Sequence, residues 1–276
     1  MTEPPAEYGI VGHPVAHSRS PFIHAMFARS TAQNMVYRMH DVHPDQLRAF
    51  VEDFWRRGGR GLNVTVPHKI AAAGLVRAMS ARATRAGAVN TLSMDESGIT
   101  GDNTDGAGLV RDLTVNLKLI LRGSRILLVG PGGAARGVIG PLLDAAPAAL
   151  VIAGRSAARA ADLAGQFVAD GPVTGCALDG IAPGAFNLVI NATSAGLTAE
   201  VPAIPAGVLG AQTFCYDMSY AREGTAFMRW AAAQGCRRTA QGWGMLVEQA
   251  AESFALWRGV RPPTAPVLAA LAAGEV

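Results

Sequence analysis

The sequence of 276 residues contains little charge. Charged residues make up 16% of it, below the quarter that is usual in globular proteins, while half of the residues are hydrophobic. Lysine and arginine number 24 against 21 acidic residues, and a net charge of +3 gives no reason to expect a polyanionic partner. This composition argues against a disordered chain and predicts one or two domains with well-buried cores.

A basic cluster, Arg56-Arg57-Gly58-Gly59-Arg60, has a faint likeness to a nucleic-acid-binding segment. No aromatic residues alternate with its arginines, as a stacking surface would require. Cations are favourable at the C-terminal end of a helix, and glycine is common just after it. We therefore interpret the cluster as a helix end and expect no nucleic-acid partner.

Cysteine is scarce. Cys176, Cys215 and Cys236 are odd in number and have the spacing of neither a disulfide framework nor a zinc site. We interpret them as free thiols in a reducing compartment and expect a cytoplasmic protein. The histidines between residues 13 and 24 have no acid or cysteine at ligand spacing, so we expect no metal.

Long hydrophobic runs are also missing. The alanine-rich stretches near Ala145 and Ala265 are interrupted by proline and glycine, and neither reaches the roughly 20 apolar residues needed to span a bilayer. The first twelve residues, MTEPPAEYGIVG, show no positive leader before an apolar segment. We therefore expect neither a signal peptide nor a membrane partner.

Strand and helix patterns alternate along the chain. Apolar runs typical of strands occur at 8–12, 35–39, 62–66, 88–94, 126–129, 150–153, 188–190 and 214–216. Helices are expected after Ser20, which should cap the helix that Pro21 begins, and at 46–57, 109–121, 138–143, 157–167, 225–234 and 245–257. This alternation predicts an α/β fold, with parallel strands covered by helices on both faces. The pattern restarts after residue 106, which predicts two lobes with a site between them.

A glycine-rich turn follows the apolar run 126–129 and matches the pattern G-x-G-x-x-A. Gly130 allows the tight turn, Gly132 lets a pyrophosphate approach the backbone, and Ala135 permits close packing of helix on strand. The N-terminus of the helix that follows offers free N–H groups and the positive end of its dipole to phosphates. The pattern therefore predicts a dinucleotide site.

The end of the next strand indicates which nicotinamide cofactor is bound. An NAD site would show an acidic residue about 20 positions after the glycines. The chain instead has Gly154-Arg155-Ser156-Ala-Ala-Arg159, where two guanidinium groups suit a 2′-phosphate. The structural alternative is that Ser156 caps a helix and both arginines are solvated. The absence of an acid favours NADP, and capping is expected as well.

A series of motifs resembles the shikimate dehydrogenase family over nearly the whole chain. They are HSRSP (17–21), NVTVPHK (63–69), GAVNT (87–91), DNTDG (102–106), GPGGAARG (130–137), GRSAARA (154–160), NATSAG (191–196), YDMSY (216–220) and GWGMLVEQA (242–250). The resemblance implies a substrate-binding lobe with a mixed sheet, made of residues 1–105 and completed by 241–276. It also implies a Rossmann-type NADP-binding lobe at 106–240.

The resemblance assigns roles to individual residues. The catalytic pair it implies is Lys69 and Asp105. The substrate-binding residues it implies are Ser18 and Ser20 for a carboxylate, Asn63, Thr65, Asn90 and Gln249 for ring hydroxyls, and Tyr220, which closes on the substrate. The cofactor-binding residues it implies are Gly130, Pro131, Gly132, Gly133, Ala134, Gly154, Arg155, Ser156, Arg159, Thr193, Met218 and Gly242.

The expected activity is the NADPH-dependent reduction of 3-dehydroshikimate to shikimate, a step of chorismate and aromatic amino-acid biosynthesis. An ion pair that only joins a strand to a loop is the structural alternative for Lys69 and Asp105. The functional alternatives are a relative that uses quinate or another cyclic hydroxy acid, with NAD as a possible cofactor, and a non-catalytic nucleotide-binding regulator. In the family, threonine at the position of Ser20 tends to accompany quinate use. A monomer or a homodimer is expected.

Three residues depart from the family pattern. His68 replaces an apolar aromatic residue, Gly154 replaces an asparagine, and Gln241 replaces a smaller polar residue. His68 either alters the pocket beside Lys69 or packs in the same space, and a neutral histidine is amphipathic enough to pack. The departures bear on substrate range and cofactor preference.

Overall fold

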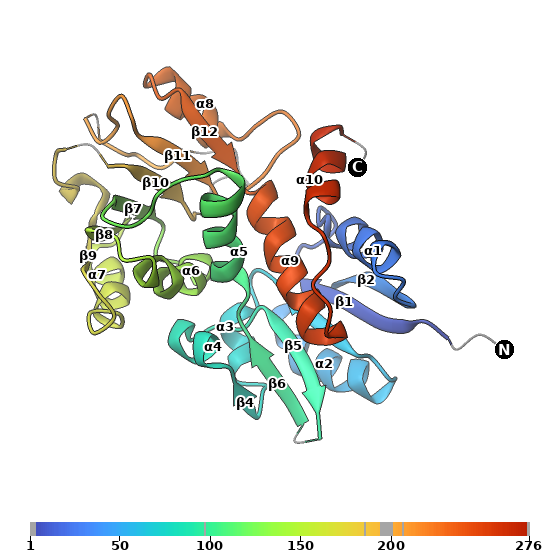
Figure 1. Ribbon diagram of the computed structural model, residues 1–276. Helices are drawn as coiled ribbons and strands as arrows, with labels where there is room; N and C mark the ends of the chain where they lie inside the picture. Colours follow the sequence, from blue (N-terminus) through green and yellow to red (C-terminus); the bar gives the residue numbers. More distant parts are fainter. Residues whose placement is uncertain (1–3, 97, 185, 194–200, 206, 275–276) are drawn as a thin grey trace. The chain divides into compact units, whose positions relative to one another are not determined.

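The computed structural model describes residues 4–96, 98–184, 186–193, 201–205 and 207–274. The chain divides into two compact units (Figure 1). The first comprises Met1–Gly108 and Leu246–Val276, and the second comprises Leu109–Met245. The NATSAG motif extends beyond the described residues from position 194 onward.

The first unit contains a six-stranded mixed sheet in the order β2-β1-β3-β5-β6-β4. Its strands are β1 (Ala6–Gly12), β2 (Met35–Asp41), β3 (Gly61–Val64), β4 (Ala78–Met79), β5 (Thr91–Asp95) and β6 (Gly98–Asp102). Strand β1 pairs in parallel with β2 and β3, whereas β5 pairs antiparallel with β3 and β6. All four residues of β3 are buried, including the polar Asn63.

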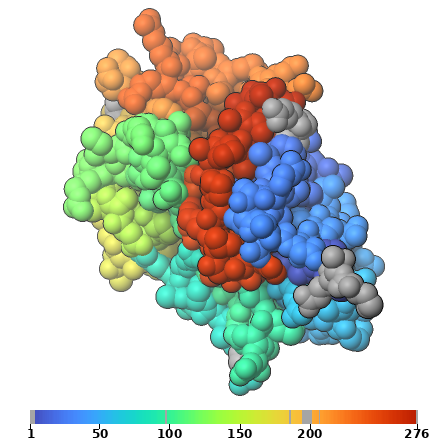
Figure 2. Space-filling model, turned by 45° about the vertical axis from the view of Figure 1, so that its right-hand side comes forward, coloured from blue at the N-terminus to red at the C-terminus, as the bar shows by residue number. Residues whose placement is uncertain are grey.

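Helices from both ends of the chain complete this unit. They are α1 (Ser20–Ser30), α2 (Leu47–Arg56), α3 (Lys69–Ala73), α4 (Ala81–Ala86), the greater part of α9 (Trp243–Arg258), α10 (Ala265–Ala272) and a 3₁₀ turn at Pro44–Gln46. Helix α9 packs Val247 and Phe254 in one core cluster with Phe27 of α1 and Val267 of α10. The C-terminal segment therefore lies beside the N-terminal helix, as red against blue in Figure 2.

The second unit contains six parallel strands in the order β12-β11-β10-β7-β8-β9. They are β7 (Arg125–Val129), β8 (Ala149–Gly154), β9 (Val173–Ala177), β10 (Leu188–Asn191), β11 (Phe214–Asp217) and β12 (Arg238–Gln241). The helices are α6 (Gly133–Asp144), α7 (Ala157–Gly165), α8 (Ala226–Ala233) and a 3₁₀ turn at Leu178–Gly180. Strand order reverses between β7 and β10, the switch point at which such sheets bind ligands.

The segment between the two sheets differs from the expected helix at 109–121. Helix α5 (Asp105–Arg111) is followed by one π-helical turn, Asp112–Asn116. The buried Asp112 carboxylate accepts hydrogen bonds from the Tyr216 hydroxyl (2.7 Å) and the Asn116 amide (2.9 Å). These bonds hold the wider turn, and the apolar spacing alone does not distinguish it from an α-helix.

Several other expectations also differ from the structure. Helix α1 begins at Ser20 itself with Arg19 as N-cap and no capping side chain, so the prediction that Ser20 caps this helix is wrong. The strands β4, β6, β9 and β12 were not expected. Three of them, β4, β9 and β12, lie at sheet edges, where residues are partly exposed and the apolar pattern is lost. Among the described residues, none of the helices has the length and apolar composition needed to cross a membrane.

Two adjacent residues of the second unit provide a test of the packing. Phe167 is 1% exposed and belongs to the main core cluster, whereas Val168 is 63% exposed. Phe167→Ala should lower the free energy of unfolding by about 3–5 kcal/mol, because it leaves a cavity in a close-packed core. Val168→Ala should change it by less than about 0.5 kcal/mol. Urea denaturation measures both, and equal effects would contradict the core assignment.

Candidate active site

Lys69 and Asp105, which lie far apart in the chain, form an ion pair in the first unit. Lys69 begins α3 directly after the β3 turn, and Asp105 begins α5. Lys69 Nζ lies 2.6 Å from Asp105 Oδ2, and the two side chains are 14% and 5% exposed. An ammonium group has three hydrogens, so this bond leaves two for other acceptors.

A stability role accounts poorly for this pair. Desolvating two charges costs about as much as their attraction returns, so a buried ion pair is weak evidence for stability. The residue type is also informative, because Lys69 and Lys118 are the only lysines in the sequence. The other 22 of the 24 basic residues are arginines, which cannot release a proton in the physiological range. Lysine therefore stands at the position where a proton donor would be useful.

Amide and hydroxyl groups hold Asp105 in place. Asn90 Nδ2 donates to Asp105 Oδ1 (2.9 Å) and to Thr104 Oγ1 (2.8 Å). Asn103 Oδ1 accepts from the Asp105 backbone N–H (3.1 Å). Gln249 of α9 turns its carbonyl oxygen toward Asn90 Nδ2 (3.4 Å) and donates from Nε2 to the Leu246 carbonyl (2.8 Å). The predicted residues Asn90 and Gln249 thus adjoin the ion pair.

Asn63 joins the same network from β3. Its amide nitrogen lies 3.2 Å from Thr91 Oγ1 and 2.9 Å from Ser253 Oγ, and its carbonyl oxygen accepts from the Tyr37 hydroxyl (2.8 Å). Asn63 was expected from the sequence, whereas Tyr37 and Ser253 were not. Thr91 stands inside a quoted motif, whereas Tyr37 and Ser253 follow from no sequence pattern, because they meet the site only through the fold.

Ser18 and Ser20 lie together at the start of α1. Ser18 Oγ accepts from the Ser20 backbone N–H (3.3 Å) and donates to Ser20 Oγ (3.2 Å). The Ser20 N–H is engaged by Ser18 and Pro21 has none, so the first turn can offer an anion the Phe22 N–H together with the two serine hydroxyls. Thr65 follows β3 and packs its methyl group against Gly12. In the described part of the chain, no recorded hydrogen bond joins Ser18, Ser20 or Thr65 to Lys69 or Asp105.

His68, the residue before Lys69, is a packing residue. It is buried, and its Nε2 lies 2.8 Å from the Val42 carbonyl. A carbonyl oxygen can only accept, so Nε2 carries the proton. Burial lowers the pKa of the His68 ring, which keeps it neutral. The departure from an aromatic residue is therefore accommodated by one added hydrogen bond.

The predicted nucleotide residues lie at the carboxyl ends of neighbouring strands in the second unit. Gly130 follows β7 with φ of +103°, and a Cβ there would lie 2.7 Å from the Thr193 side chain. Gly132 is the N-cap of α6 and provides no capping side chain. A Cβ on Gly132 or Gly133 would meet open space, so the free N–H groups of this helix have room for a phosphate. This turn fits a dinucleotide.

The segment after β8 fits a phosphorylated ribose. Arg155 and Arg159 are exposed, and Ser156 Oγ caps α7 by accepting from the Arg159 N–H (3.3 Å). Ser156 therefore caps the helix, as the structural alternative predicted, and the guanidinium groups of Arg155 and Arg159 are exposed to solvent. A Cβ on Gly154 would lie 2.5 Å from the Pro131 ring. Proline in the glycine turn thus explains why position 154 has no side chain.

Three more predicted residues follow β10, β11 and β12. Thr193 Oγ1 donates to Asn191 Oδ1 (2.7 Å), and Asn191 Nδ2 donates to Asp217 Oδ1 (3.1 Å). Met218 follows Asp217, and the Met218 carbonyl lies against Gly242, where a side chain would overlap it. Burial raises the pKa of the Asp217 carboxyl. Asn191 and Asp217 stand inside the motifs NATSAG and YDMSY but were not predicted as site residues.

Two aromatic rings and Gln241 complete this edge. Tyr220 packs on Trp243 with ring centroids 4.3 Å apart. Gln241 Oε1 accepts from the Ala221 N–H (2.9 Å), so this departure from the family pattern supports the loop that carries Tyr220. The structure leaves the role of Tyr220 toward a substrate as a prediction.

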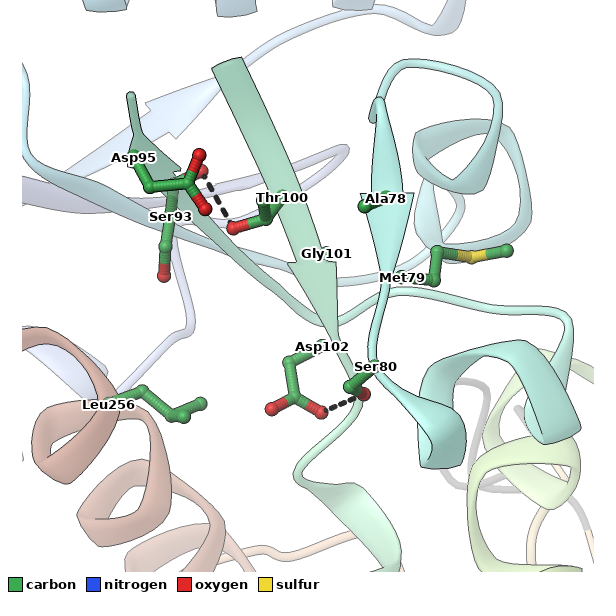
Figure 3. Close-up of a pocket in the computed structure, with 9 residues that line it drawn as sticks. All are labelled: Ala78, Met79, Ser80, Ser93, Asp95, Thr100, Gly101, Asp102 and Leu256. Carbon is green, nitrogen blue, oxygen red and sulfur yellow. Dashed lines mark hydrogen bonds between the residues drawn. The ribbon is translucent and has the colours of Figure 1, made fainter. Parts of the chain in front are cut away.

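A cavity of about 290 Å³ lies elsewhere in the first unit, between β4, β5 and β6 (Figure 3). Ser80, Asp102 and Leu256 are among its lining residues, and none of the predicted site residues is. Asp102 accepts hydrogen bonds from Ser80 Oγ and from Arg82 Nε, both at 2.6 Å. The carboxylate in its wall thus serves to fix the loop that leads to Asp105.

Comparison with known proteins bears on the identity of this fold and site. Residues 10–92 match the shikimate dehydrogenase substrate binding domain, and residues 242–272 match the shikimate 5′-dehydrogenase C-terminal domain. A shikimate dehydrogenase (NADP(+)) of Methylococcus capsulatus is 50% identical over 274 residues, covering 99% of this chain and 98% of the relative. The chain belongs to the shikimate dehydrogenase family.

Solved structures agree with this membership. An Ael1 enzyme from Pseudomonas putida has a TM-score of 0.90 at 42% identity, over 96% of this chain and 98% of its own. Shikimate 5-dehydrogenase from Thermus thermophilus, solved in complex with NADP(H) and shikimate, has a TM-score of 0.86 at 31% identity. That match covers 98% of this chain and all of the other. The family resemblance and the α/β fold with a Rossmann-type sheet are confirmed.

The exposed arginine after β8 allows a test of cofactor choice in this shikimate dehydrogenase family member. Arg155→Ala should raise the Kd for NADP at least tenfold and change the Kd for NAD little, because only NADP carries the 2′-phosphate. Arg122→Ala, at an exposed turn of the same unit, is the matched control. Calorimetric titration measures both constants. Equal weakening of NADP and NAD would remove the phosphate assignment.

Proposed function

We propose that this protein is an NADP-dependent shikimate dehydrogenase that reversibly reduces 3-dehydroshikimate to shikimate. The observation that carries the proposal is the 2.6 Å contact between Lys69 Nζ and Asp105 Oδ2 within a network of amides and hydroxyls. Such a network suits a polyhydroxylated ring, because each ring hydroxyl both donates and accepts. The named family relatives support the same activity.

The reaction divides between the cofactor and the side chains of the protein. The turn 130–134 and Arg155 would hold NADPH, whose nicotinamide would be the source of the hydride for the carbonyl carbon of the substrate. Negative charge then grows on the carbonyl oxygen, where the Lys69 ammonium stabilises it and delivers a proton. Asp105 orients Lys69 and accepts a hydrogen bond from the neighbouring ring hydroxyl. One hydride and one proton are added, and in the reverse direction Lys69 takes the proton back.

The remaining residues are proposed to hold the substrate. Ser18 and Ser20, with the uncapped N-terminus of α1, would bind the carboxylate. Gln249 would contact a ring hydroxyl, since one N–H of its amide is not used by Leu246. Asn90, whose amide donates to Asp105, belongs to the same proposed set. Asn63, Thr65 and Tyr220 stay in the same proposed set. Residues 1–105 with 241–276 are proposed as the substrate-binding domain, and 106–240 as the NADP-binding domain.

The proposal also covers the cellular compartment and the oligomeric state. The three cysteines are free thiols, and Cys215 and Cys236 are buried, which supports a reducing compartment such as the cytoplasm. A monomer or a homodimer is proposed, and light scattering of the purified protein distinguishes the two.

The proposed activity is tested with four substrate and cofactor pairs. Reduction of NADP in the presence of shikimate should be fast, and reduction of NAD or the use of quinate should be much slower. Absorbance of the reduced nicotinamide follows each reaction. Activity mainly with NAD and quinate would favour the quinate-using alternative. No turnover, combined with nucleotide binding, would favour the non-catalytic regulator.

The two lysines of the chain form a matched pair for testing the proton donor. Lys69→Ala should lower kcat by at least about 10²–10⁴-fold, because general acid catalysis is lost. Lys69→Arg keeps the charge and should fail nearly as badly, since guanidinium does not release a proton. Lys118→Ala, at an exposed position, should leave kcat unchanged. Retention of activity in Lys69→Arg would show that charge alone suffices and that Lys69 is no acid.

A further inference from the structure

The hydroxyl of Ser253 occupies the centre of the polar network in the first unit. Ser253 lies on α9, and no part of it is exposed. Its Oγ lies 2.9 Å from Asn63 Nδ2, 2.8 Å from Thr91 Oγ1, and 3.2 Å from both Thr104 Oγ1 and the backbone carbonyl oxygen of Gln249. One side chain thus links α9 to β3, to β5 and to the loop before α5.

The hydrogen-bonding capacity of a hydroxyl constrains these contacts. Ser253 Oγ has one hydrogen and two lone pairs. The Asn63 amide donates to one lone pair, and the hydrogen of Ser253 goes to the backbone carbonyl of Gln249. The second lone pair is left for the hydroxyls of Thr91 and Thr104. The hydroxyl is therefore fully engaged within the protein and has no capacity left for a ligand. Any role of Ser253 in the reaction must act through its neighbours.

The neighbours of Ser253 are those proposed to bind the substrate. The bond to Ser253 is the shortest of the three contacts of Asn63 Nδ2, since those to the Asn90 carbonyl and to Thr91 Oγ1 are both 3.2 Å. Gln249 lies one helical turn before Ser253 on the same face of α9. Thr104 precedes Asp105 and bonds to Asn90. Ser253 therefore fixes the position of α9 relative to the residues around the ion pair.

We propose that Ser253 is a positioning residue for substrate binding. It holds the Asn63 side chain, whose carbonyl oxygen keeps one lone pair beside the Tyr37 hydroxyl for a ring hydroxyl of shikimate. It also bonds to the backbone carbonyl of Gln249 and so fixes the helical turn that carries the Gln249 side chain. The proposal rests on the proposed function. If Ser253 acted only within α9, its replacement would have a different effect. A serine that bonds back to the preceding turn slightly destabilises a helix, whereas alanine stabilises the helix. Replacement by alanine would then be neutral or stabilising, without effect on substrate affinity.

The test compares Ser253→Ala with Ser124→Ala. Ser124 is also buried and donates to a backbone carbonyl, that of Leu121, but it lies in the second unit outside the proposed site. Ser253→Ala should raise the KM for shikimate about fivefold, the effect typical of one lost hydrogen bond. Its kcat should stay within about twofold and its KM for NADP should be nearly unchanged. Its Tm should fall by a few degrees, because buried hydrogen bonds are lost. Ser124→Ala should leave both KM values unchanged.

Two kinetic results would overturn the proposal. One is an unchanged KM for shikimate. The other is an equal rise in the KM values for shikimate and NADP together with a fall in Tm, which would mark Ser253 as merely structural. A crystal structure of Ser253→Ala provides a readout that needs no turnover, because the Asn63 and Gln249 amides should move from their present hydrogen bonds. If the unaltered protein does not oxidise shikimate, the proposed function fails, and unmoved amides in this crystal would still refute the positioning role.

Discussion

The bond between the Lys69 ammonium and the Asp105 carboxylate is the interaction on which this account depends. It joins two motifs from different parts of the chain and is largely withdrawn from solvent. The attraction within such a pair roughly offsets the cost of desolvation, so the pair adds little stability. Its importance lies in how the two charged groups act on a bound substrate. An ammonium that is held but not saturated can stabilise a growing negative charge and release a proton to it.

The packing of the first unit explains how that geometry is maintained. Lys69 begins a helix whose preceding residue, His68, is fixed to the Val42 carbonyl. Asp105 begins another helix, and the Arg82–Asp102 pair fixes the loop before it. Amides and hydroxyls from β3, β5 and α9 fill the space around both, and nearly all of these groups satisfy one another. A polar interior of this kind is rigid, which suits a site that must present hydrogen bonds in fixed directions.

Much of this arrangement was predictable from sequence, and the reasons for the failures are physical. The glycine turn after β7, the NADP-type arginines after β8 and the meeting of Lys69 with Asp105 followed from motifs. The π-helical turn at Asp112 and the edge strands did not, because buried polar bonds and partial exposure leave no apolar period. Tyr37 and Ser253 escaped detection for a related reason. Tyr37 stands next to Arg38 in β2 and Ser253 next to Glu252 in α9, so neither differs in polarity from its neighbours, and only the fold shows that each faces Asn63.

The measurement that tests the central claim most directly is a crystal structure of the protein with shikimate and NADP bound. The account predicts that one ring hydroxyl lies within hydrogen-bonding distance, about 2.6–3.2 Å, of Lys69 Nζ, and that Asp105 bonds to a ring hydroxyl beside it. Shikimate bound with its hydroxyls away from both side chains, or the two charged groups separated into solvent, would contradict the account.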